Sequence, residues 1–288
     1  MPCFSPIWVR RQKMHVPCGK CNFCLDRRRK EWAFRLNQEK LFSLSSVFVT
    51  LTYSEAPVSS WSGLPTLSRL DVQRFMKRLR KRQAKLLAGL PVVYRSRRYD
   101  LEHIPIRYYL VGEYGSKGRP HYHALIFNLI PRVIAEVSEI WGHGFTVVGE
   151  CEPRSVNYVS GYVMTKQQNV SEEQVQPFAL ITNRSGGLGI KYLQTHRRWH
   201  YEARIFHTQD GKRKGSLPRF YREKIFNEAQ RARYAAELQV GLQEKELARI
   251  EELSKFHPDP WAYDLEVREQ AHRRLGEKFI KYKNESRL

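Results

Sequence analysis

The sequence predicts an α+β fold in which an antiparallel sheet carries helices on one face. A cysteine-rich segment precedes this sheet and a helical extension follows it. Short stretches that alternate apolar and polar residues indicate strands, and longer stretches with apolar residues at helical spacing indicate helices. The predicted elements follow one another in the order β-α-β-β-α-β-α. This order is close to that of a ferredoxin-like sandwich, the arrangement of RRM-like domains.

The first half of the pattern begins with a basic amphipathic helix over residues 25–42. Residues 47–53 (VFVTLTY) alternate and are rich in β-branched and aromatic side chains, which predicts a strand. After a loop rich in proline and glycine, Ser68 can cap a helix that runs to about Leu87, with Asp71 three residues into it. The side chains that we expect to face inward from this helix are Leu70, Phe75, Met76 and Leu79.

The second half centres on a hairpin. Residues 106–114 and 120–129 predict two strands, because glycines at both ends of residues 115–118 favour a tight turn between them. The remaining elements are a helix from Pro131 to Trp141, a strand over residues 144–149, and a helix over about 156–168 that Ser155 can cap.

Four parts of the chain differ in composition. They are a cysteine-rich segment with the basic helix (1–42), the core that holds the sheet (43–170), a basic aromatic extension (171–225) and a charged helical tail (226–288).

The charge of the chain predicts an anionic partner. Fifty Lys and Arg against 29 Asp and Glu leave a net charge of +21. Nucleic acid is the leading candidate, because binding to phosphates releases counterions whatever the base sequence. A membrane surface or an acidic protein would also suit this charge. Since no window holds about 20 apolar residues and the N-terminus lacks an apolar signal segment, we expect a soluble intracellular protein that does not enter a membrane.

The five cysteines are Cys3, Cys18, Cys21, Cys24 and Cys151. An odd number in an intracellular chain argues against a disulfide framework. The spacing Cys18-x2-Cys21-x2-Cys24, with Gly19 for a tight turn, suits a structural zinc site to which Cys3 would add a fourth thiolate. A reduced cysteine cluster at the start of a helix explains the spacing equally well. An iron–sulfur cluster is less favoured, because no Cys-Pro follows at the ferredoxin spacing.

His121 and His123 stand two residues apart on a predicted strand, so their side chains should project to the same face. Glu113 lies eight residues earlier, across the predicted turn, and its carboxylate could reach that face. Two imidazoles and one carboxylate suit Mg²⁺ or Mn²⁺ acting on a phosphate. The same set also describes a non-haem iron oxygenase, although that triad is more often His-x-Asp/Glu with a distant His. Ordinary packing of a short His-x-His strand is the simplest alternative.

Tyr158, Tyr162 and Lys166 recur at helical spacing and should form one stripe. Such a stripe is commonly a set of core aromatics. The alternative is a pair of nucleophiles with a cation beside them. A phenol is a weak nucleophile at neutral pH, because its reference pKa is about 10. Lys166 could favour the phenolate or stabilise the charge that develops on a phosphate.

Together these motifs resemble the HUH endonucleases, in which a His-hydrophobe-His strand binds the metal and a helical tyrosine attacks DNA. The motifs are Arg119-Pro120-His121-Tyr122-His123 and Tyr158-Val-Ser-Gly-Tyr162-Val-Met-Thr-Lys166, preceded by a strand, Phe48–Tyr53, that is similar to the earlier family motif. The layout is most similar to replication initiators of small single-stranded DNA bacteriophages, the microviruses, and in particular the gokushovirus group. Supporting matches over about residues 3–225 are residues 16–24, Arg28-x3-Trp32-Ala33-x-Arg35, Gly112–Gly115, Trp141–Gly144 and Pro218–Tyr221.

The resemblance implies rolling-circle initiation. Tyr158 or Tyr162 would attack the origin strand, keep its 5′ end as a phosphotyrosine and leave a 3′-OH, and the second tyrosine would later allow the strand to be rejoined. Glu113, His121 and His123 would bind Mg²⁺ or Mn²⁺, and Lys166 would assist. Many relatives have Lys-Lys where this chain has Lys166-Gln167.

The resemblance also implies partners. These are single-stranded origin DNA, a host polymerase and a host helicase in the cytoplasm of a bacterial cell. A nucleotide cofactor is not expected, because the sequence has no phosphate-binding loop of the Gly-x4-Gly-Lys-Ser/Thr type. Basic residues that could hold DNA are Arg78, Lys81 and Arg119.

Two other functions fit parts of the pattern. A plasmid initiator, relaxase or transposase would use the same chemistry, although relaxases usually have a third histidine and single-tyrosine transposases are shorter. A non-catalytic nucleic-acid-binding protein with an RRM-like sheet would stack aromatic side chains such as Tyr53 and Tyr109 on bases.

Overall fold

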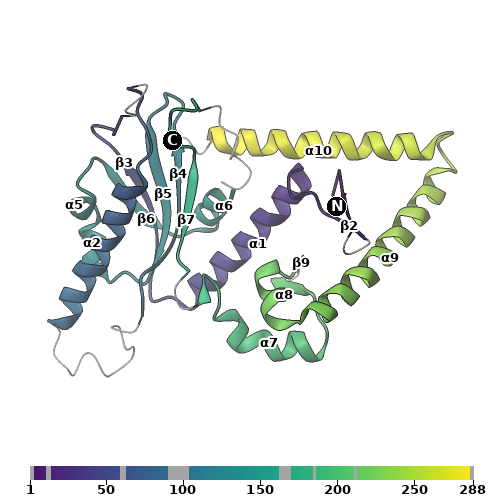
Figure 1. Cartoon of the computed structure of the whole chain (residues 1–288), viewed down its shortest axis with the longest axis horizontal. Helices are drawn as coiled ribbons and strands as arrows, with labels where there is room; N and C mark the ends of the chain where they lie inside the picture. Colours follow the sequence, from purple (N-terminus) through teal and green to yellow (C-terminus); the bar gives the residue numbers. More distant parts are fainter. Residues whose placement is uncertain are drawn as a thin grey trace. The chain divides into compact units, whose positions relative to one another are not determined.

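A computed structural model describes residues 3–10, 14–58, 63–89, 104–161, 170–183, 186–210 and 213–285. The chain forms two compact units, and Figure 1 labels their helices and strands along the sequence. We call Ala33–Tyr192 the central unit, and Met1–Trp32 together with Leu193–Leu288 the terminal unit. Helix α1 (Asn22–Leu41) begins in the terminal unit and ends in the central unit.

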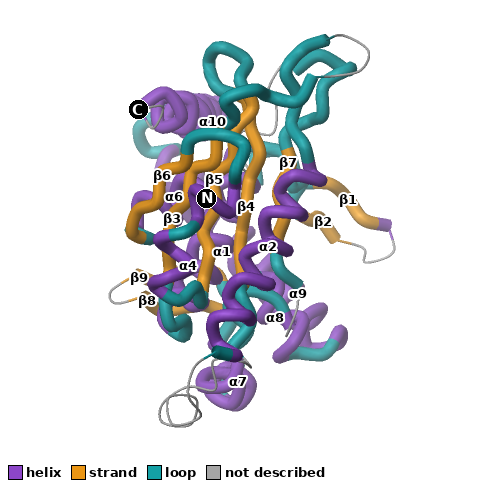
Figure 2. The backbone as a smooth tube through the Cα atoms, turned by 90° about the vertical axis from the view of Figure 1, so that its left-hand side faces the viewer, coloured by secondary structure: helices purple, strands orange, loops and turns teal. Residues whose placement is uncertain are grey.

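The central unit is built on a five-stranded antiparallel sheet (Figure 2). Its strands are β3 (Ser46–Thr52), β4 (Arg107–Tyr114), β5 (Pro120–Phe127), β6 (Thr146–Glu150) and β7 (Phe178–Ile181). They lie in the order β6-β3-β5-β4-β7, and every neighbouring pair is antiparallel. The first four strands have the order of a ferredoxin-like sheet, so the predicted α+β class is confirmed. Strand β7 at the edge of the sheet was not predicted.

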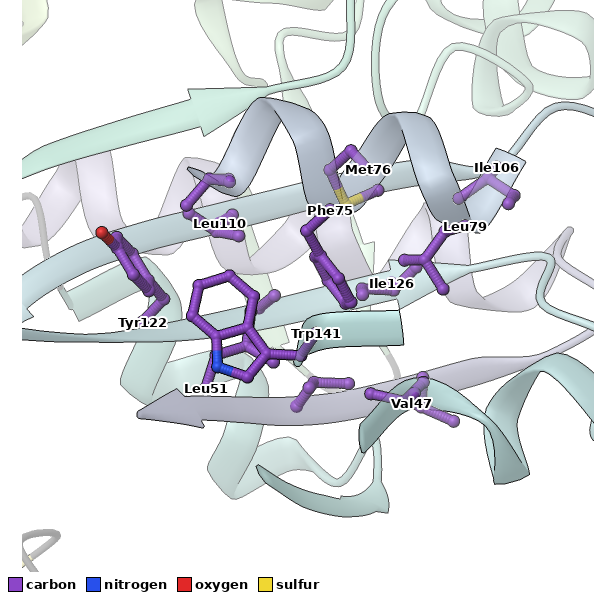
Figure 3. Close-up of a cluster of buried hydrophobic side chains, with 14 of the residues drawn as sticks. Val47, Leu51, Phe75, Met76, Leu79, Ile106, Leu110, Tyr122, Ile126 and Trp141 are labelled. Carbon is purple, nitrogen blue, oxygen red and sulfur yellow. The ribbon is translucent and has the colours of Figure 1, made fainter. Parts of the chain in front are cut away.

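Three helices cover one face of this sheet, and the hydrophobic core lies between them and the strands (Figure 3). They are α2 (Arg69–Ala88), α4 (Pro131–Ala135) and α5 (Val137–Trp141). Phe75 and Trp141 are fully buried there. Burial of a side chain such as Phe75 stabilises the fold by about 1.5–3 kcal/mol. The single helix predicted from Pro131 to Trp141 is divided at Glu136.

The start of α2 confirms one detail of the sequence analysis and corrects another. Ser68 caps the helix, because its hydroxyl accepts a hydrogen bond from the Asp71 amide at 3.1 Å. Leu70 was expected to face inward, but its side chain is 52% exposed. Its place in the core is taken by Val72, which lies deeper along the helix and is fully buried.

The opposite face of the sheet carries α6 (Pro153–Gly161), so helices lie on both faces rather than on one as predicted. Ser155 was predicted to cap this helix but lies inside it, where its hydroxyl donates to the Glu150 carbonyl at 3.4 Å. Val159 is fully buried, as expected for a residue on the side that faces the sheet. The expected end of the helix, with Tyr162 and Lys166, lies outside the described residues.

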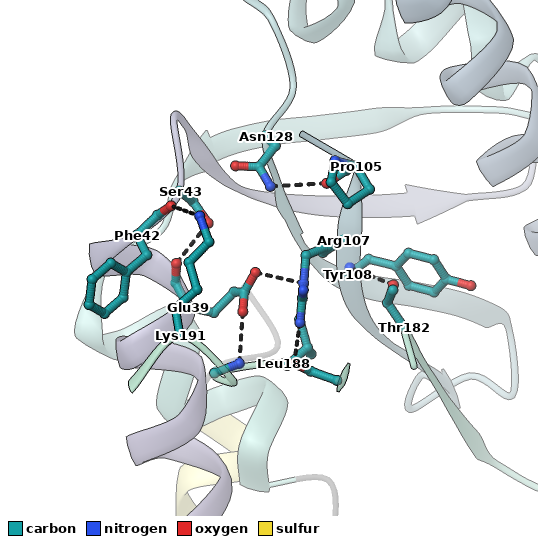
Figure 4. A network of polar contacts seen from close by, with 12 residues as sticks. Glu39, Phe42, Ser43, Pro105, Arg107, Tyr108, Asn128, Thr182, Leu188 and Lys191 are labelled. Atoms are coloured by element: carbon teal, nitrogen blue, oxygen red, sulfur yellow. Dashed lines mark hydrogen bonds and ion pairs between the residues drawn. The ribbon is translucent and has the colours of Figure 1, made fainter. Parts of the chain in front are cut away.

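A buried ion pair joins β4 to the end of α1 within the central unit (Figure 4). Arg107 Nε lies 2.7 Å from Glu39 Oε1, and both side chains are at most 8% exposed. Glu39 also accepts a hydrogen bond from the Gly189 amide at 2.7 Å, and Arg107 donates to the Gly187 carbonyl. The glycine-rich segment after β7 is therefore held against the sheet by two charged side chains that neutralise each other.

In the part of the chain that the structure describes, the terminal unit contains two small hairpins and four further helices. Its elements are β1 (Ile7–Val9), β2 (Met14–Val16), α7 (Tyr192–Glu202), β8 (His207–Asp210), β9 (Arg213–Ser216), α8 (Arg219–Ile225), α9 (Glu228–Leu253) and α10 (Pro260–Glu285). Phe206 stacks on Phe226 and Tyr234 with ring centroids 4.1 and 3.7 Å away. Helix α9 begins with a capping box formed by Asn227 and Gln230. The predicted helical extension is thus confirmed.

None of the helices in the described residues combines the length and the apolar character needed to span a membrane.

Candidate active site

The hairpin of β4 and β5 places the three predicted metal ligands together. Glu113 and His121 are directly paired across the two strands, and His123 follows two residues later on the same face. The turn between the strands closes with a hydrogen bond of 2.9 Å from the Gly115 amide to the Arg119 carbonyl. Tyr122, which lies between the histidines, points to the opposite face and is fully buried in the core. The alternation predicted from the sequence is therefore present.

The ligand atoms of these three side chains lie close together. His121 Nε2 lies 3.3 Å and His123 Nε2 lies 3.4 Å from the same carboxylate oxygen of Glu113, Oε1. Adjacent ligands of an octahedral ion with bonds of 2.0–2.1 Å are separated by about 3 Å. The donor set and its spacing thus fit a metal ion.

Each histidine is oriented through its other ring nitrogen. The Thr50 hydroxyl lies 2.9 Å from His123 Nδ1, and the Arg119 carbonyl lies 3.2 Å from His121 Nδ1. Phe48 stacks on the His123 ring, with centroids 5.6 Å apart and planes at 5°. Since such contacts fix the direction of the imidazole, the two Nε2 atoms are held toward Glu113 before any ion binds.

The electrostatics of the site favour the protonation states that a metal requires. Burial would raise the pKa of Glu113, but hydrogen bonds from His121, His123 and Tyr158 outweigh it and hold that pKa well below its usual range. Burial lowers the pKa of His123, against the opposing effect of Glu113. At neutral pH the carboxylate is therefore ionised and the His123 ring is neutral.

Helix α6 brings one of the predicted tyrosines to these ligands. The Tyr158 hydroxyl donates a hydrogen bond to Glu113 Oε1, the same oxygen that the histidines contact. Its ring lies edge-on to His123, with centroids 4.7 Å apart and planes at 82°. Tyr158 and His121 are both half-buried. A phenol, a carboxylate and two imidazoles thus form one cluster on this face of the sheet.

The other predicted residues lie elsewhere. Tyr162 and Lys166 are outside the described residues. Arg119 is exposed in the hairpin turn, and only its backbone contacts the site. Arg78 and Lys81 are on α2, which covers the opposite face of the sheet, and the Arg78 guanidinium donates to the Ile140 and Trp141 carbonyls at 2.8 and 3.0 Å. DNA binding by these three basic residues stays a prediction.

Sequence reasoning assigned no role to Thr50 or Phe48. The signal was present, because both residues share the alternation of β3 and face the same side of the sheet as His123, which is the direct partner of Thr50.

The motif Trp141-Gly-His-Gly144 has a structural role next to the site. The Trp141 indole donates to the Thr52 carbonyl at 2.7 Å, and the Ser54 amide donates to the His143 carbonyl at 2.9 Å. A Cβ atom on Gly144 would lie 2.4 Å from Ser54 N. The glycine therefore allows the backbone to pass close to the end of β3.

Comparisons with known proteins place the site within a family. The family model of replication-associated protein ORF2/G2P matches residues 46–168, which include the whole cluster. The chain is 30% identical over 235 residues to replication-associated protein ORF2 of Spiroplasma virus 4, covering 75% of this chain and 69% of the relative. It is 28% identical over 252 residues to replication-associated protein VP4 of Bdellovibrio phage phiMH2K, covering 82% and 75%.

A third relative, replication-associated protein ORF4 of Chlamydia phage 1, is 26% identical over 178 residues, covering 55% of this chain and 40% of the relative. No solved structure matches the chain. The resemblance seen in the motifs is confirmed, and the chain belongs to the ORF2/G2P family of replication-associated proteins, among those of single-stranded DNA bacteriophages.

Proposed function

We propose that this protein starts rolling-circle replication by nicking single-stranded origin DNA in a metal-dependent reaction that links a tyrosine to the DNA. The observation that carries the proposal is the contact of Tyr158 with Glu113, at the oxygen shared with His121 and His123. A nucleophile and a metal-binding set within one hydrogen bond of each other are what transesterification of a phosphodiester requires.

The proposed reaction exchanges one ester for another. The Tyr158 oxygen attacks the scissile phosphorus, the bond from phosphorus to the 3′ oxygen breaks, and the 5′ end becomes a phosphotyrosine ester. The phenol loses its proton and the departing 3′ oxygen gains one. The hydrogen bond to the ionised Glu113 holds the phenol oxygen beside the metal-binding residues.

Glu113, His121 and His123 fit Mg²⁺ or Mn²⁺ as resident ion, because one carboxylate and two imidazoles leave coordination positions for phosphate oxygens. A bound divalent ion would polarise the scissile phosphate and neutralise its charge. The chain itself supplies the orientation of both imidazoles, through Thr50 and the Arg119 carbonyl, and the placement of the phenol.

Tyr162 and Lys166 are included in the proposed active site because of their spacing from Tyr158 in the sequence. Positions four and eight residues after Tyr158 share its side of a helix, so a second tyrosine could accept the strand after a full circle and permit rejoining. The net charge of +21 supports a DNA partner whose affinity falls steeply with salt. The free 3′-OH requires a polymerase, and strand separation requires a helicase, both of which we propose to come from the host.

The alternative functions fit the structure less well. In an RRM-like binding protein Tyr53 and Tyr109 would stack on bases, but their side chains are 7% and 1% exposed. Tyr53 also uses its hydroxyl inside the core, where it donates to Asp71 at 3.0 Å. Relaxases usually add a third histidine to the metal set, whereas Glu113 takes that position among the described residues.

The test is formation of a covalent adduct. Wild-type protein should form an SDS-resistant complex with a labelled origin oligonucleotide when Mn²⁺ or Mg²⁺ is added. The double variant His121→Ala/His123→Ala should form none, yet keep most of its low-salt DNA binding, which is electrostatic. Full activity of this variant would remove the metal assignment.

Single and double substitutions distinguish the roles of the two tyrosines. Tyr158→Phe and Tyr162→Phe should each reduce adduct formation, and the double variant should abolish it. Tyr201→Phe, at a 52% exposed position of the terminal unit, is the matched control and should behave as wild type. An adduct that survives in the double variant would place the nucleophile elsewhere.

A further inference from the structure

The four N-terminal cysteines form a compact group of sulfur atoms in the terminal unit. The Sγ atoms of Cys3, Cys18, Cys21 and Cys24 all lie within 4.8 Å of one another. Cys3 and Cys21 are 3.8 Å apart, and Cys18 and Cys24 are 4.0 Å apart. In a tetrahedral zinc site with Zn–S bonds of about 2.3 Å, neighbouring sulfurs are separated by about 3.8 Å. The group therefore has the dimensions of a site for one ion.

The backbone around these sulfurs is arranged to stabilise thiolates. The amides of Lys20 and Cys21 donate to Cys18 Sγ at 3.4 and 3.3 Å, and the amide of Cys18 donates to Cys3 Sγ at 3.2 Å. Gly19 provides the turn with a φ of +73°. Hydrogen bonds from amides to sulfur offset negative charge, as a metal-bound thiolate requires.

The same segment contacts the C-terminal helix α10, which is also part of the terminal unit. The Asn22 amide donates to His272 Nε2 at 3.0 Å, and the Asn22 side chain donates to the His272 carbonyl at 3.0 Å. Phe4 stacks on the His272 ring, with centroids 4.8 Å apart, and Phe23 packs against its edge at 5.4 Å. Phe4, Asn22 and Phe23 are each next to a cysteine in the sequence, and the carbonyl of Cys3 itself accepts a hydrogen bond from Arg268 of α10 at 3.5 Å. The shape of the cysteine group therefore sets the surface that receives α10.

We propose that Cys3, Cys18, Cys21 and Cys24 bind one Zn²⁺ as a tetrathiolate site, and that this zinc holds the N-terminal segment in the form that docks α10. The site is structural, because four protein ligands leave no open position for a substrate. Soft thiolates select zinc, whereas the imidazole and carboxylate ligands of the active site suit Mg²⁺ or Mn²⁺. The two sites therefore take different metals, and this proposal does not rest on the nicking activity.

The metal is tested on the full chain, purified under reducing conditions. Wild-type protein and the variant His121→Ala/His123→Ala should each hold about one zinc, and Co²⁺ substituted for it should show a thiolate-to-cobalt charge-transfer band. Cys21→Ser should lose both signals. Cys151→Ser is the matched control, because Cys151 is a buried cysteine of the central unit, and it should keep them.

The docking role is tested by hydrogen exchange. Chelation of the zinc should raise exchange of α10 amides around His272 several-fold, and His272→Ala should do the same while it retains zinc. Unchanged exchange after zinc removal would overturn the docking role. Absence of zinc and of the cobalt–thiolate band in reduced wild-type protein would overturn the zinc site, and so would iron bound in place of zinc. An equal loss of zinc in Cys151→Ser would also overturn it. The zinc content, the cobalt band and the hydrogen exchange are all measured on wild-type protein. The proposal can therefore be refuted even if Cys21→Ser does not fold.

Discussion

Replacement of Thr50 by valine tests whether the contacts behind the histidines matter for metal binding. The Thr50 hydroxyl lies 2.9 Å from His123 Nδ1. When Nε2 binds an ion, Nδ1 carries the ring proton, and the hydroxyl oxygen is its acceptor. Valine has nearly the same shape but offers no acceptor, so Thr50→Val leaves the buried N–H of His123 without its partner while the strand remains intact.

The expected magnitude follows from this single contact. Loss of a hydrogen bond to a metal-bound histidine typically weakens metal affinity by about 10- to 100-fold. This corresponds to about 1.4–2.8 kcal/mol. The ring would keep its stacking on Phe48 at 5.6 Å, so the effect should appear in metal affinity rather than in folding.

The assay is a Mn²⁺ titration of adduct formation, with isothermal calorimetry of Mn²⁺ binding beside it. The half-saturating Mn²⁺ concentration should rise by about 10- to 100-fold in Thr50→Val, and activity should return toward wild type at saturating Mn²⁺. Thr52→Val is the matched control. Thr52 lies two residues further on the same face of β3, and its hydroxyl donates to the Phe145 carbonyl at 2.9 Å.

Two results would refute this reasoning. An unchanged Mn²⁺ dependence in Thr50→Val would mean that the hydroxyl does not orient a metal ligand. An equal loss in Thr52→Val would mean that the strand, rather than the contact, controls the affinity.

Two substitutions test the packing that supports the site. Glu39→Ala leaves Arg107 as an unpaired buried charge and should cost about 3–5 kcal/mol, seen as a large fall in Tm, whereas Glu202→Ala removes a pair whose carboxylate is 59% exposed and should cost almost nothing. Equal losses would contradict the buried pair. Gly144→Ala places a Cβ atom 2.4 Å from a backbone nitrogen and should lower the Tm, whereas Gly149→Ala meets no atom within 4 Å and should not. A neutral Gly144→Ala would contradict the close approach.

Much of the central unit could be predicted because its sequence signals are local. Alternation over residues 47–53 marks β3, and the turn at residues 115–118 marks the strands on either side of it. The period of two along a strand places His121 and His123 on one face. The pairing of Glu113 with His121 followed from a short turn. These features depend on residues that are close together in the chain, so they can be predicted from a single sequence.

The features that were missed depend on distant contacts. Strand β7 has four residues, and only its pairing with β4 makes it a strand. The miss at Leu70 is local instead, because at 100° per residue Leu70 lies on the side of α2 opposite Val72 and Leu79 and therefore faces outward. The ion pair of Glu39 with Arg107 joins residues far apart in the sequence, and charged residues give no local sign of burial.

The central claim is that a tyrosine beside the Glu113, His121 and His123 cluster becomes linked to DNA. Mass-spectrometric mapping of the adduct tests it most directly, because trypsin releases residues 155–166 as one peptide that holds Tyr158 and Tyr162. We predict that this peptide carries a nucleotide on Tyr158 or Tyr162, only when Mn²⁺ or Mg²⁺ was present. A nucleotide on any other residue, or an adduct that forms equally well in a chelator, would contradict the account.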